Sequence, residues 1–422
     1  MKDLSGYKIL IMDYRNGISI AQKLAESFGT VFYSCPYVTN GFPEHTPFDV
    51  GNNVPNIVKV KEWAEVYDEA DAVMFTDSME PHLQNWMKNN GKPVFGSVFA
   101  EKLEHDRVYI KEVLKDLGLP VGPYTVSDGI DELEQSLMNA NEGYVKSSLR
   151  GNGETWKHKS WPLSKRQLMK LRHEMGLYEN RERYVFERVL EVLIEFGYDG
   201  FIVGGQYVPI SMCGIEKKDA CYLGKFILYE WLPEQIKMVN DKLAPIFEEM
   251  GYNGHYSNEI IVSKDKRGFL IDNTCRFPSP PGELMLEIYT NYAEIVWMIA
   301  NGRMPVIEFK DEWGAQLIIK SAIAEEDPSP ILVPDEYKKY VKIKNLSIDE
   351  DGTWYFVPSP GLHMQEIGSI VFTSNSCEGV IKGIKEIAES IKGFDTCVDM
   401  DSLDEAKKDL EKLKRSGIKY IL

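Results

Sequence analysis

The chain has little of what metal centres, disulfide frameworks and membrane spans are made from. Its six cysteines include no C-x-x-C pair and its seven histidines no H-x-x-x-H pattern, so we expect neither a zinc site nor a disulfide framework. No run approaches the ~18 apolar residues of a membrane-spanning helix. The apolar run near the N-terminus is too short for the core of a signal peptide. These absences predict a protein of the reducing cytoplasm with no membrane partner.

The chain also lacks an excess of positive charge. It has 48 Lys and Arg against 65 Asp and Glu, which gives a formal net charge of -17. The summed field of such a chain repels polyanions, so nucleic acid is excluded as an expected partner. Any phosphate-bearing ligand must therefore be held by a local group of basic side chains.

The residues that are present have the pattern of a folded α/β (α+β) protein. A length of 422 residues exceeds the ~250 to 300 that one core usually serves, and 43% of the residues are hydrophobic. Residues 1–100 alternate strand and helix patterns, which predicts a parallel α/β domain, and the first loop carries no G-x-G-x-x-G dinucleotide fingerprint. Residues 306–422 mix strand patterns with two helices and predict a small C-terminal α+β domain.

Between these two regions the pattern becomes antiparallel. Residues 184–210 contain β-rich runs, with Asp199-Gly200 and Gly204-Gly205 as expected tight turns. The segment 212–221 that follows could contribute to a substrate site or could be an ordinary strand pair. The sequence does not decide between them.

A lysine precedes a glycine-rich loop in the stretch GYVKSSLRGNGET, residues 143–155. Lys146 ends a short apolar run, and the loop after it is rich in backbone N–H groups that could surround a triphosphate. A solvated hairpin turn explains the stretch equally well. The same two interpretations, phosphate contact or solvated face, apply to Arg107 and Lys111 on a helix with its apolar face elsewhere.

Two acidic residues are expected to face each other on a hairpin. If residues 259–272 fold symmetrically about Asp265 and Lys266, Glu259 pairs with Asp272. Directly opposed carboxylates repel each other, and Mg²⁺ between them would remove the repulsion because it prefers carboxylate oxygen. The alternative is a solvent-facing pair at the open end of the hairpin, where the repulsion is screened.

Taken in order, these stretches resemble the ATP-grasp ligases, and among them the phosphoribosylamine–glycine ligases. VFGSVFAEKLEHDRVYIKEVL is similar to that family's F-G-P…A-x-x-L-E-x-S-K-x-F-x-K segment, and GYVKSSLRGNGET to its P-V-V-K strand and phosphate loop. FERVLEVLIE is similar to its E-E-F-L-x-G-x-E linker, and the hairpin of residues 259–276 to its metal-binding strands ending in E-x-N-x-R. The similarity covers roughly residues 90–300.

The resemblance implies an ATP-grasp fold with a Rossmann-like N-terminal domain (1–100), an ATP-grasp domain (101–305, with a lid at about 121–185) and the C-terminal domain (306–422). It implies ATP and Mg²⁺ as cofactors, with Mn²⁺ as an alternative, and small-molecule carboxylate and amine substrates for a monomer or homodimer. The residues it assigns to nucleotide binding are Arg107, Lys111, Lys146, Ser147, Gly151, Gly153, Glu187 and Glu195. It assigns Glu259, Asp272 and Thr274 to the metal and Arg276 to the acyl phosphate.

Several residues depart from the family pattern. Arg107 stands where the family has lysine, Thr274 where it has asparagine, and DYRNGIS replaces the glycine-rich first loop. The resemblance therefore leaves three functions open. They are a carboxylate–amine ligase most like phosphoribosylamine–glycine ligase, a related ligase for another amino acid and amine, and a nucleotide-binding protein without ligase activity. Residues 156–158, beyond the loop, could touch substrate or lie on an exposed loop end.

Overall fold

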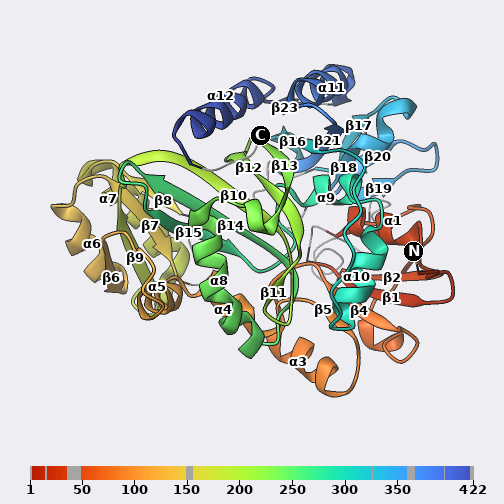
Figure 1. Cartoon of the computed structure of the whole chain (residues 1–422), viewed down its shortest axis with the longest axis horizontal. Coiled ribbons are helices and arrows are strands. Elements are labelled where there is room, and N and C mark those ends of the chain that lie inside the picture. The colour runs from red at the N-terminus through yellow and green to blue at the C-terminus, as the bar shows by residue number, and fades with distance from the viewer. Residues whose placement is uncertain are drawn as a thin grey trace.

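The computed structural model describes residues 2–14, 17–35, 49–148, 155–325, 327–358, 366–393 and 395–418. The chain combines helices with parallel and antiparallel strands, so its fold class is α+β, as predicted. A parallel sheet lies at the N-terminus, a small four-stranded sheet projects from one side, and a large antiparallel sheet joins them (Figure 1). No helix among the described residues is long and apolar enough to span a bilayer.

The N-terminal sheet confirms the expected parallel layer. Its five strands have the order β3-β2-β1-β4-β5, with parallel pairing throughout. After β1 the chain adds β2 and β3 on one side of the sheet, and it then adds β4 and β5 on the other side. The carboxyl ends of β1 and β4 therefore form the switch point, where the direction of strand addition reverses. The strands are β1 (Lys8–Met12), β2 (Thr30–Ser34), β3 (Ile57–Lys59), β4 (Ala72–Phe75) and β5 (Val94–Phe95), with helices α1 (Ile18–Ala25) and α3 (Pro81–Asn89).

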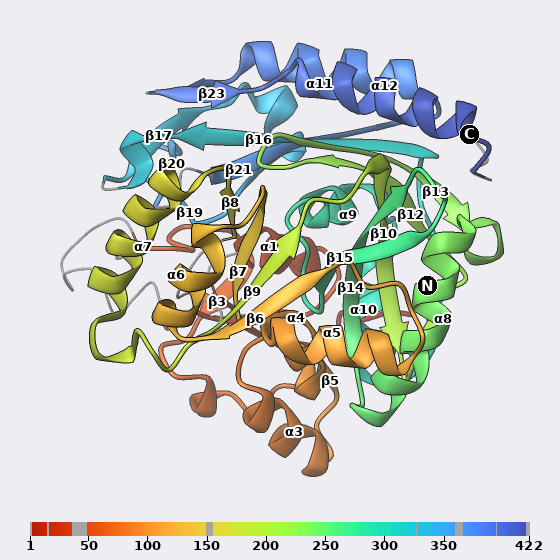
Figure 2. The ribbon, with the colours of Figure 1, turned by 90° about the vertical axis from the view of Figure 1, so that its left-hand side faces the viewer.

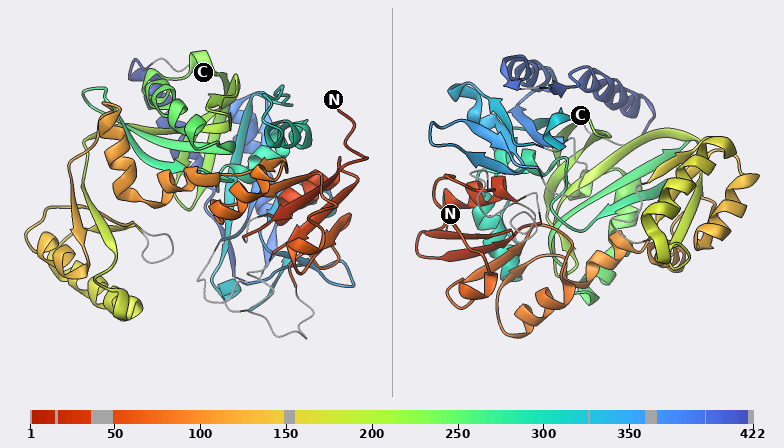
Figure 3. Two further views of the ribbon diagram at one scale, coloured as in Figure 1. Left: turned by 90° about the horizontal axis from the view of Figure 1, so that it is seen from below. Right: turned by 180° about the vertical axis from the view of Figure 1, so that it is seen from behind.

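The small sheet forms a separate body with its own apolar core. Its strand order is β6-β9-β7-β8, and α6 (Ile130–Met138) and α7 (Trp161–Met175) pack on it through Leu133, Leu168 and Leu171. Figure 3 shows this body projecting from the rest of the molecule. Two helices precede it, α4 (Glu101–His105) and α5 (Arg107–Asp116). Its strands are β6 (Tyr124–Asp128), β7 (Gly143–Ser147), β8 (Trp156–His158) and β9 (Arg183–Arg188).

The central sheet continues through the C-terminal region. Its main path is β15-β14-β10-β12-β13-β16-β21-β18, with β11 on β10 and β23 on β16. One hydrophobic core joins this sheet to a face of the N-terminal sheet. The strands are β10 (Val192–Val203), β11 (Gln206–Tyr207), β12 (Ile210–Lys217), β13 (Cys221–Leu228), β14 (Asn253–Ser263), β15 (Gly268–Thr274), β16 (Trp313–Ser321), β18 (Val341–Ile343), β21 (Glu366–Ser374) and β23 (Thr396–Val398).

Helices cover the central sheet, with α11 on β16 and β21 and α12 on β12 and β13 (Figure 1). A further antiparallel sheet of order β19-β20-β17-β22 completes the C-terminal region. Its strands are β17 (Ser329–Leu332), β19 (Leu346–Ile348), β20 (Trp354–Phe356) and β22 (Lys392–Gly393). The helices are α8 (Glu234–Glu249), α9 (Gly282–Ile288), α10 (Tyr292–Ala300), α11 (Cys377–Ser390) and α12 (Ser402–Arg415). The domain boundaries at 100, 305 and 121–185 stay predictions.

One of the two expected tight turns is wrong. Gly204 and Gly205 form a turn with φ of 52° and 78°, values that suit glycine because it has no Cβ. Asp199 and Gly200 instead lie inside β10, where Asp199 pairs with Ser257 of β14 and with Met212 of β12. The Asp-Gly pair is a local turn signal, and the pairing of a long strand on both sides outweighs it.

Candidate active site

Glu259 and Asp272 face each other across β14 and β15. The predicted register is correct from Ser257–Thr274 to this pair and fails only toward the turn, because Ile260 faces Leu270 where Ile271 was expected. Ile271 is therefore an extra residue in a bulge, which shifts the pairing toward the turn by one residue. Without the bulge, Asp272 would turn to the other face of the sheet and the carboxylates would part.

Glu259 and Asp272 line a cleft of about 500 Å³ that lies between the small sheet and the central sheet. This volume is within the range of small-molecule sites. The side chain of Asp272 is 44% exposed, so it presents its carboxylate to the cleft. In Figure 2, β7 and β9 of the small sheet lie to the left of β15 of the central sheet. The lining residues include Arg107, Tyr144, Lys146, Thr155, Glu187, Glu195, Glu216, Lys217, Ser257, Glu259, Asp272, Thr274, Arg276 and Ser279.

Three basic side chains gather next to the acids. Lys146, at the end of β7, donates from Nζ to the carbonyl of the bulged Ile271 over 3.0 Å. Its Nζ also lies 3.2 Å from Glu187 Oε2, and Lys111 Nζ lies 2.7 Å from Glu187 Oε1. Burial alone would raise the pKa of Glu187, but Lys146 and Lys111 lower it below the ordinary value. Glu187 is therefore an anion that holds two lysines at the edge of the cleft.

The third basic side chain, Arg107, contacts the acid pair directly. Its Nη1 donates to Asp272 Oδ1 over 2.8 Å. The resemblance assigned Arg107 to nucleotide binding, and in the protein alone it pairs with one of the two acids. Burial would raise the pKa of Asp272, yet Arg107 and Lys146 lower it to about 2. Asp272 is ionised at neutral pH.

A third carboxylate that the sequence reading missed lies beside Glu259. Glu216, on β12, is hydrogen bonded to Glu259. Burial and Glu259 raise the pKa of Glu216, and burial and Asp272 raise that of Glu259. Both carboxyl groups therefore bind a proton more readily than exposed glutamates do. The only sequence signal was the segment 212–221, which now contributes Glu216, Lys217 and Lys218 to the cleft wall.

The donor set suits magnesium. The described residues contain no group of three or more Asp, Glu, His or Cys side chains already arranged around a metal position. Two opposed carboxylates, Glu259 and Asp272, are the protein ligands that Mg²⁺ uses when phosphate oxygens and water supply the rest. Thr274 also lines the cleft and faces Ser257 across the strand pair.

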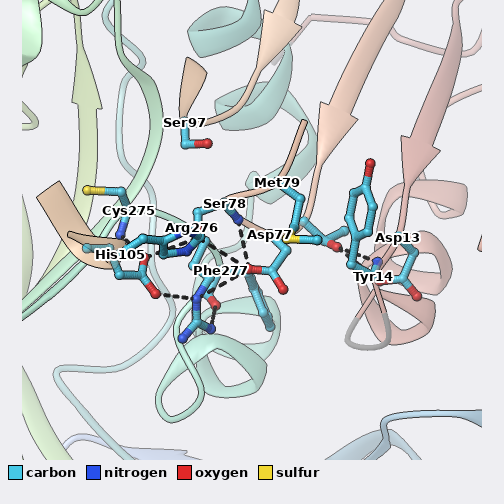
Figure 4. Close-up of polar contacts among 12 residues, drawn as sticks. Asp13, Tyr14, Asp77, Ser78, Met79, Ser97, His105, Cys275, Arg276 and Phe277 are labelled. Atoms are coloured by element: carbon cyan, nitrogen blue, oxygen red, sulfur yellow. Dashed lines mark hydrogen bonds and ion pairs between the residues drawn. The ribbon is translucent and has the colours of Figure 1, made fainter. Parts of the chain in front are cut away.

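Arg276 is fixed by two buried acids from elements far away in the chain. Its Nε donates to Glu104 Oε1 over 2.8 Å and lies 3.3 Å from Asp77 Oδ1. Figure 4 shows the guanidinium of Arg276 directed at Asp77, beside Ser78 and Phe277. Glu104 is 6% exposed. Its Oε2 also accepts from the backbone N–H of Cys275 over 2.9 Å, so Glu104 holds both the side chain and the backbone here.

Some predicted site residues lie elsewhere. The hydroxyl of Ser147 donates to Glu182 over 2.7 Å and does not line the cleft. Gly151 and Gly153 lie outside the described residues. Glu195 lines the cleft from β10. In the segment 156–158, the only ion pair among the described contacts joins Lys157 to Glu142, and His158 is buried against Ser164.

Comparison with known proteins gives matches of fold. No family model matches the chain and no curated protein matches it in sequence. Phosphoribosylamine–glycine ligase from Thermotoga maritima superposes with a TM-score of 0.70 at 15% identity, over 93% of this chain and 99% of that one. The biotin carboxylase domain of 2-oxoglutarate carboxylase from Hydrogenobacter thermophilus, solved with MgADP, ADP and bicarbonate, gives 0.65 at 15% identity over 99% of each chain.

A third structure agrees with these two. N5-carboxyaminoimidazole synthetase from Staphylococcus aureus, solved with ADP, gives a TM-score of 0.59 at 12% identity over 90% of this chain and 96% of that one. At such identities the likeness establishes a shared fold over nearly the whole length of each chain.

Proposed function

Because the chain has the fold of the ATP-grasp ligases, we propose that it is an ATP-dependent ligase joining a carboxylate to an amine, with ADP and phosphate as products. Its substrates are small molecules, its cofactor besides ATP is Mg²⁺ or Mn²⁺, and it works in the cytoplasm as a monomer or homodimer. No side-chain nucleophile is needed for this chemistry.

The observation that carries the proposal is the pairing of charges in one cleft. Glu259 and Asp272 provide two opposed carboxylates, and Lys146, Arg107 and Arg276 line the same space. Phosphoryl transfer depends on positioning and charge neutralisation. This cleft supplies anionic groups for a cation and cationic groups for phosphates.

The reaction proceeds in two steps. A carboxylate oxygen of the substrate attacks the terminal phosphorus of ATP, the bond to the bridging oxygen breaks, and ADP leaves. The amine nitrogen then attacks the acyl carbon, phosphate leaves, and the nitrogen loses a proton as the amide forms. Mg²⁺ bound at Glu259 and Asp272 would neutralise charge on the phosphates.

This chain's basic residues serve different parts of that scheme. Lys146 and Arg107 bind the phosphates of ATP, and Arg276 binds the acyl phosphate oxygens because it is held rigidly at the far end of the cleft. Glu187 and Glu195 would bind the adenine and the ribose of ATP. Arg107 can bind phosphate only if its ion pair with Asp272 breaks when the nucleotide and the cation bind.

The family resemblance favours the substrate pair of phosphoribosylamine–glycine ligase. A specific observation favours the second candidate, a related ligase for another amino acid and amine. Asp13 and Asp77 follow β1 and β4 at the switch point of the N-terminal sheet (Figure 4). Asp13 is fully buried, with Thr76 Oγ1 donating to it over 3.0 Å. Carboxylates at this position repel a phosphate group.

The test combines binding with turnover. ATP is titrated calorimetrically with and without Mg²⁺, and ADP release is then screened over amino acids and amines. A carboxylate labelled with ¹⁸O should transfer one labelled oxygen to phosphate. Turnover with glycine only when phosphoribosylamine is present would select the first candidate, and turnover with another pair the second. Tight Mg-ATP binding without turnover on any pair would refute ligation and leave nucleotide binding alone.

A further inference from the structure

A buried carboxylate lies directly behind one wall of the cleft. Ser257 lines the cleft, and its Oγ donates to Asp199 Oδ1 over 2.5 Å. The hydroxyl of Tyr222 donates to Asp199 Oδ2 over 2.6 Å. Asp199 is 2% exposed. The mechanism proposed above uses none of these three side chains.

A row of glycines makes this arrangement possible. Gly197, Gly214 and Gly224 lie side by side on β10, β12 and β13, in line with Glu259 of β14. A Cβ on Gly214 or Gly224 would lie 2.6 Å from atoms of the Tyr222 ring. No real Cβ approaches a ring so closely, so only glycine leaves the space in which Tyr222 reaches Asp199.

The hydrogen bonds determine what Ser257 can offer to a ligand. A hydroxyl has one proton to donate and two lone pairs to accept with. Since the proton of Ser257 is directed to Asp199, the lone pairs remain for the cleft. A ligand group at Ser257 must therefore be a donor, and a carboxylate has none. The carboxyl groups of Asp199 and of Glu259, two residues along the strand, present acceptor oxygens on this side of the cleft and so also favour a donor.

We propose that Ser257, oriented by Asp199 and Tyr222, is the subsite that accepts an N–H of the amine substrate. This inference rests on the proposed function and places the two substrates next to each other, because Thr274 lies opposite Ser257 and two residues before Arg276. The amine lies against Ser257 on β14, and the carboxylate lies toward Arg276 at the end of β15. Asp199 is a positioning residue, because it acts through Ser257.

The chain offers a matched control on the same strand. Ser263 is 8% exposed, as Ser257 is, and its hydroxyl also donates to an aspartate, Asp265. It lies at the hairpin end of β14 and does not line the cleft. Ser263→Ala therefore removes a comparable buried hydroxyl without touching the subsite.

The experiment measures binding of a primary amine that carries no carboxylate. Ethanolamine is titrated calorimetrically into protein saturated with Mg²⁺ and the non-hydrolysable ATP analogue AMP-PNP. We expect binding to wild type and Ser263→Ala, and about tenfold weaker binding to Ser257→Ala and to Asp199→Asn, whose amide turns a donor toward Ser257. Ser257→Thr keeps a hydroxyl and should restore binding. AMP-PNP affinity should change by no more than about twofold in any variant.

Two results would overturn the inference. One is ethanolamine binding to Ser257→Ala with wild-type affinity, and the other is no binding to wild type. Failure of the proposed function has a different signature. Wild type incubated with ATP, hydroxylamine and a panel of carboxylates would form no hydroxamate, because no acyl phosphate is made, whatever the ethanolamine titration shows.

Discussion

Arg107 and Asp272 form an ion pair, with 2.8 Å between Nη1 and Oδ1. The first residue was predicted to bind phosphate and the second to bind a metal ion, and in the protein alone each is the other's counter-charge. The pair keeps Asp272 ionised and ready to receive a cation, since Arg107 and Lys146 lower its pKa to about 2. If the proposed function is correct, binding of Mg-ATP would replace this ion pair by two new ones, Asp272 with the cation and Arg107 with phosphate.

Asp272→Asn should therefore abolish ligation while the protein remains folded. The amide keeps the shape of the side chain but removes the charge that holds a cation. We expect the turnover number for ADP release to fall at least about 100-fold. Asp265→Asn, the same substitution at the exposed tip of the same hairpin, is the control and should retain wild-type turnover. Equal turnover in both variants would show that Asp272 binds no essential metal.

Lys146→Ala should mainly weaken nucleotide binding. Lys146 ends β7, where it contacts Glu187 and the bulge carbonyl of Ile271, and loss of a charge-assisted contact to phosphate costs about 1.5 to 3 kcal/mol. Calorimetry should show ATP affinity reduced by about 10- to 100-fold. Lys157→Ala removes a lysine from the neighbouring strand, where its partner is the exposed Glu142, and should leave affinity unchanged. An unaltered affinity in Lys146→Ala would exclude its role.

Glu104→Gln should impair the chemical step more than nucleotide binding. The neutral amide cannot compensate the charge of Arg276 and places a second donor where the N–H of Cys275 already donates. We expect kcat to fall at least about tenfold with ATP affinity within about twofold, and a loss of about 1 to 3 kcal/mol in the free energy of unfolding. Glu112→Gln, on an exposed position of α5, is the control. A matched fall in ATP affinity would mean that Glu104 serves the nucleotide site instead.

The pH dependence of stability should reveal the buried Asp199. Burial raises the pKa of Asp199 to about 7, whereas an unfolded aspartate titrates near ~3.9. Below the lower value both states carry the proton, and as pH rises toward 7 only the unfolded chain releases it, so the stability contributed by this group is lost. Between pH 5 and 8, wild type should lose on the order of 2 kcal/mol more than Asp199→Asn.

Urea unfolding of magnesium-free protein at both pH values measures this difference. Asp265→Asn should lose as much stability as wild type between these pH values, because the pKa of the exposed Asp265 lies below the ordinary value and outside the interval. Identical pH profiles for wild type and Asp199→Asn would show that Asp199 titrates as an exposed carboxyl does.

The sequence predicted those parts of the site that depend on local pairing. A hairpin is closed by neighbouring residues, so the spacing of Glu259 and Asp272 was enough to place them opposite each other. The bulge at Ile271 was not predictable. A bulge depends on how side chains pack on one face of the sheet, and it has no local sequence signal of the kind that marks a turn. The alternating strand and helix patterns of residues 1–100 likewise begin with one strand and one helix that match β1 and α1, since both have clear apolar periodicity.

The parts that the sequence did not predict come from distant segments. Arg276 and Glu104 are 172 residues apart in the chain, and no local pattern brings them together. Asp199 was placed at a turn because Asp-Gly is a turn signal, yet it lies in the middle of a sheet with its carboxylate bonded by hydroxyls from two other strands. Buried polar groups of this kind are satisfied by tertiary contacts, which a single sequence does not show.

The central claim is that Glu259 and Asp272 hold a divalent cation together with a nucleotide. The most direct measurement is calorimetric titration of ADP into wild type and Glu259→Gln, each with and without Mg²⁺. Our account predicts that Mg²⁺ increases ADP affinity about tenfold or more in wild type and has no such effect in Glu259→Gln, while metal-free ADP affinity is similar in both. An equal gain from Mg²⁺ in both proteins would contradict the account.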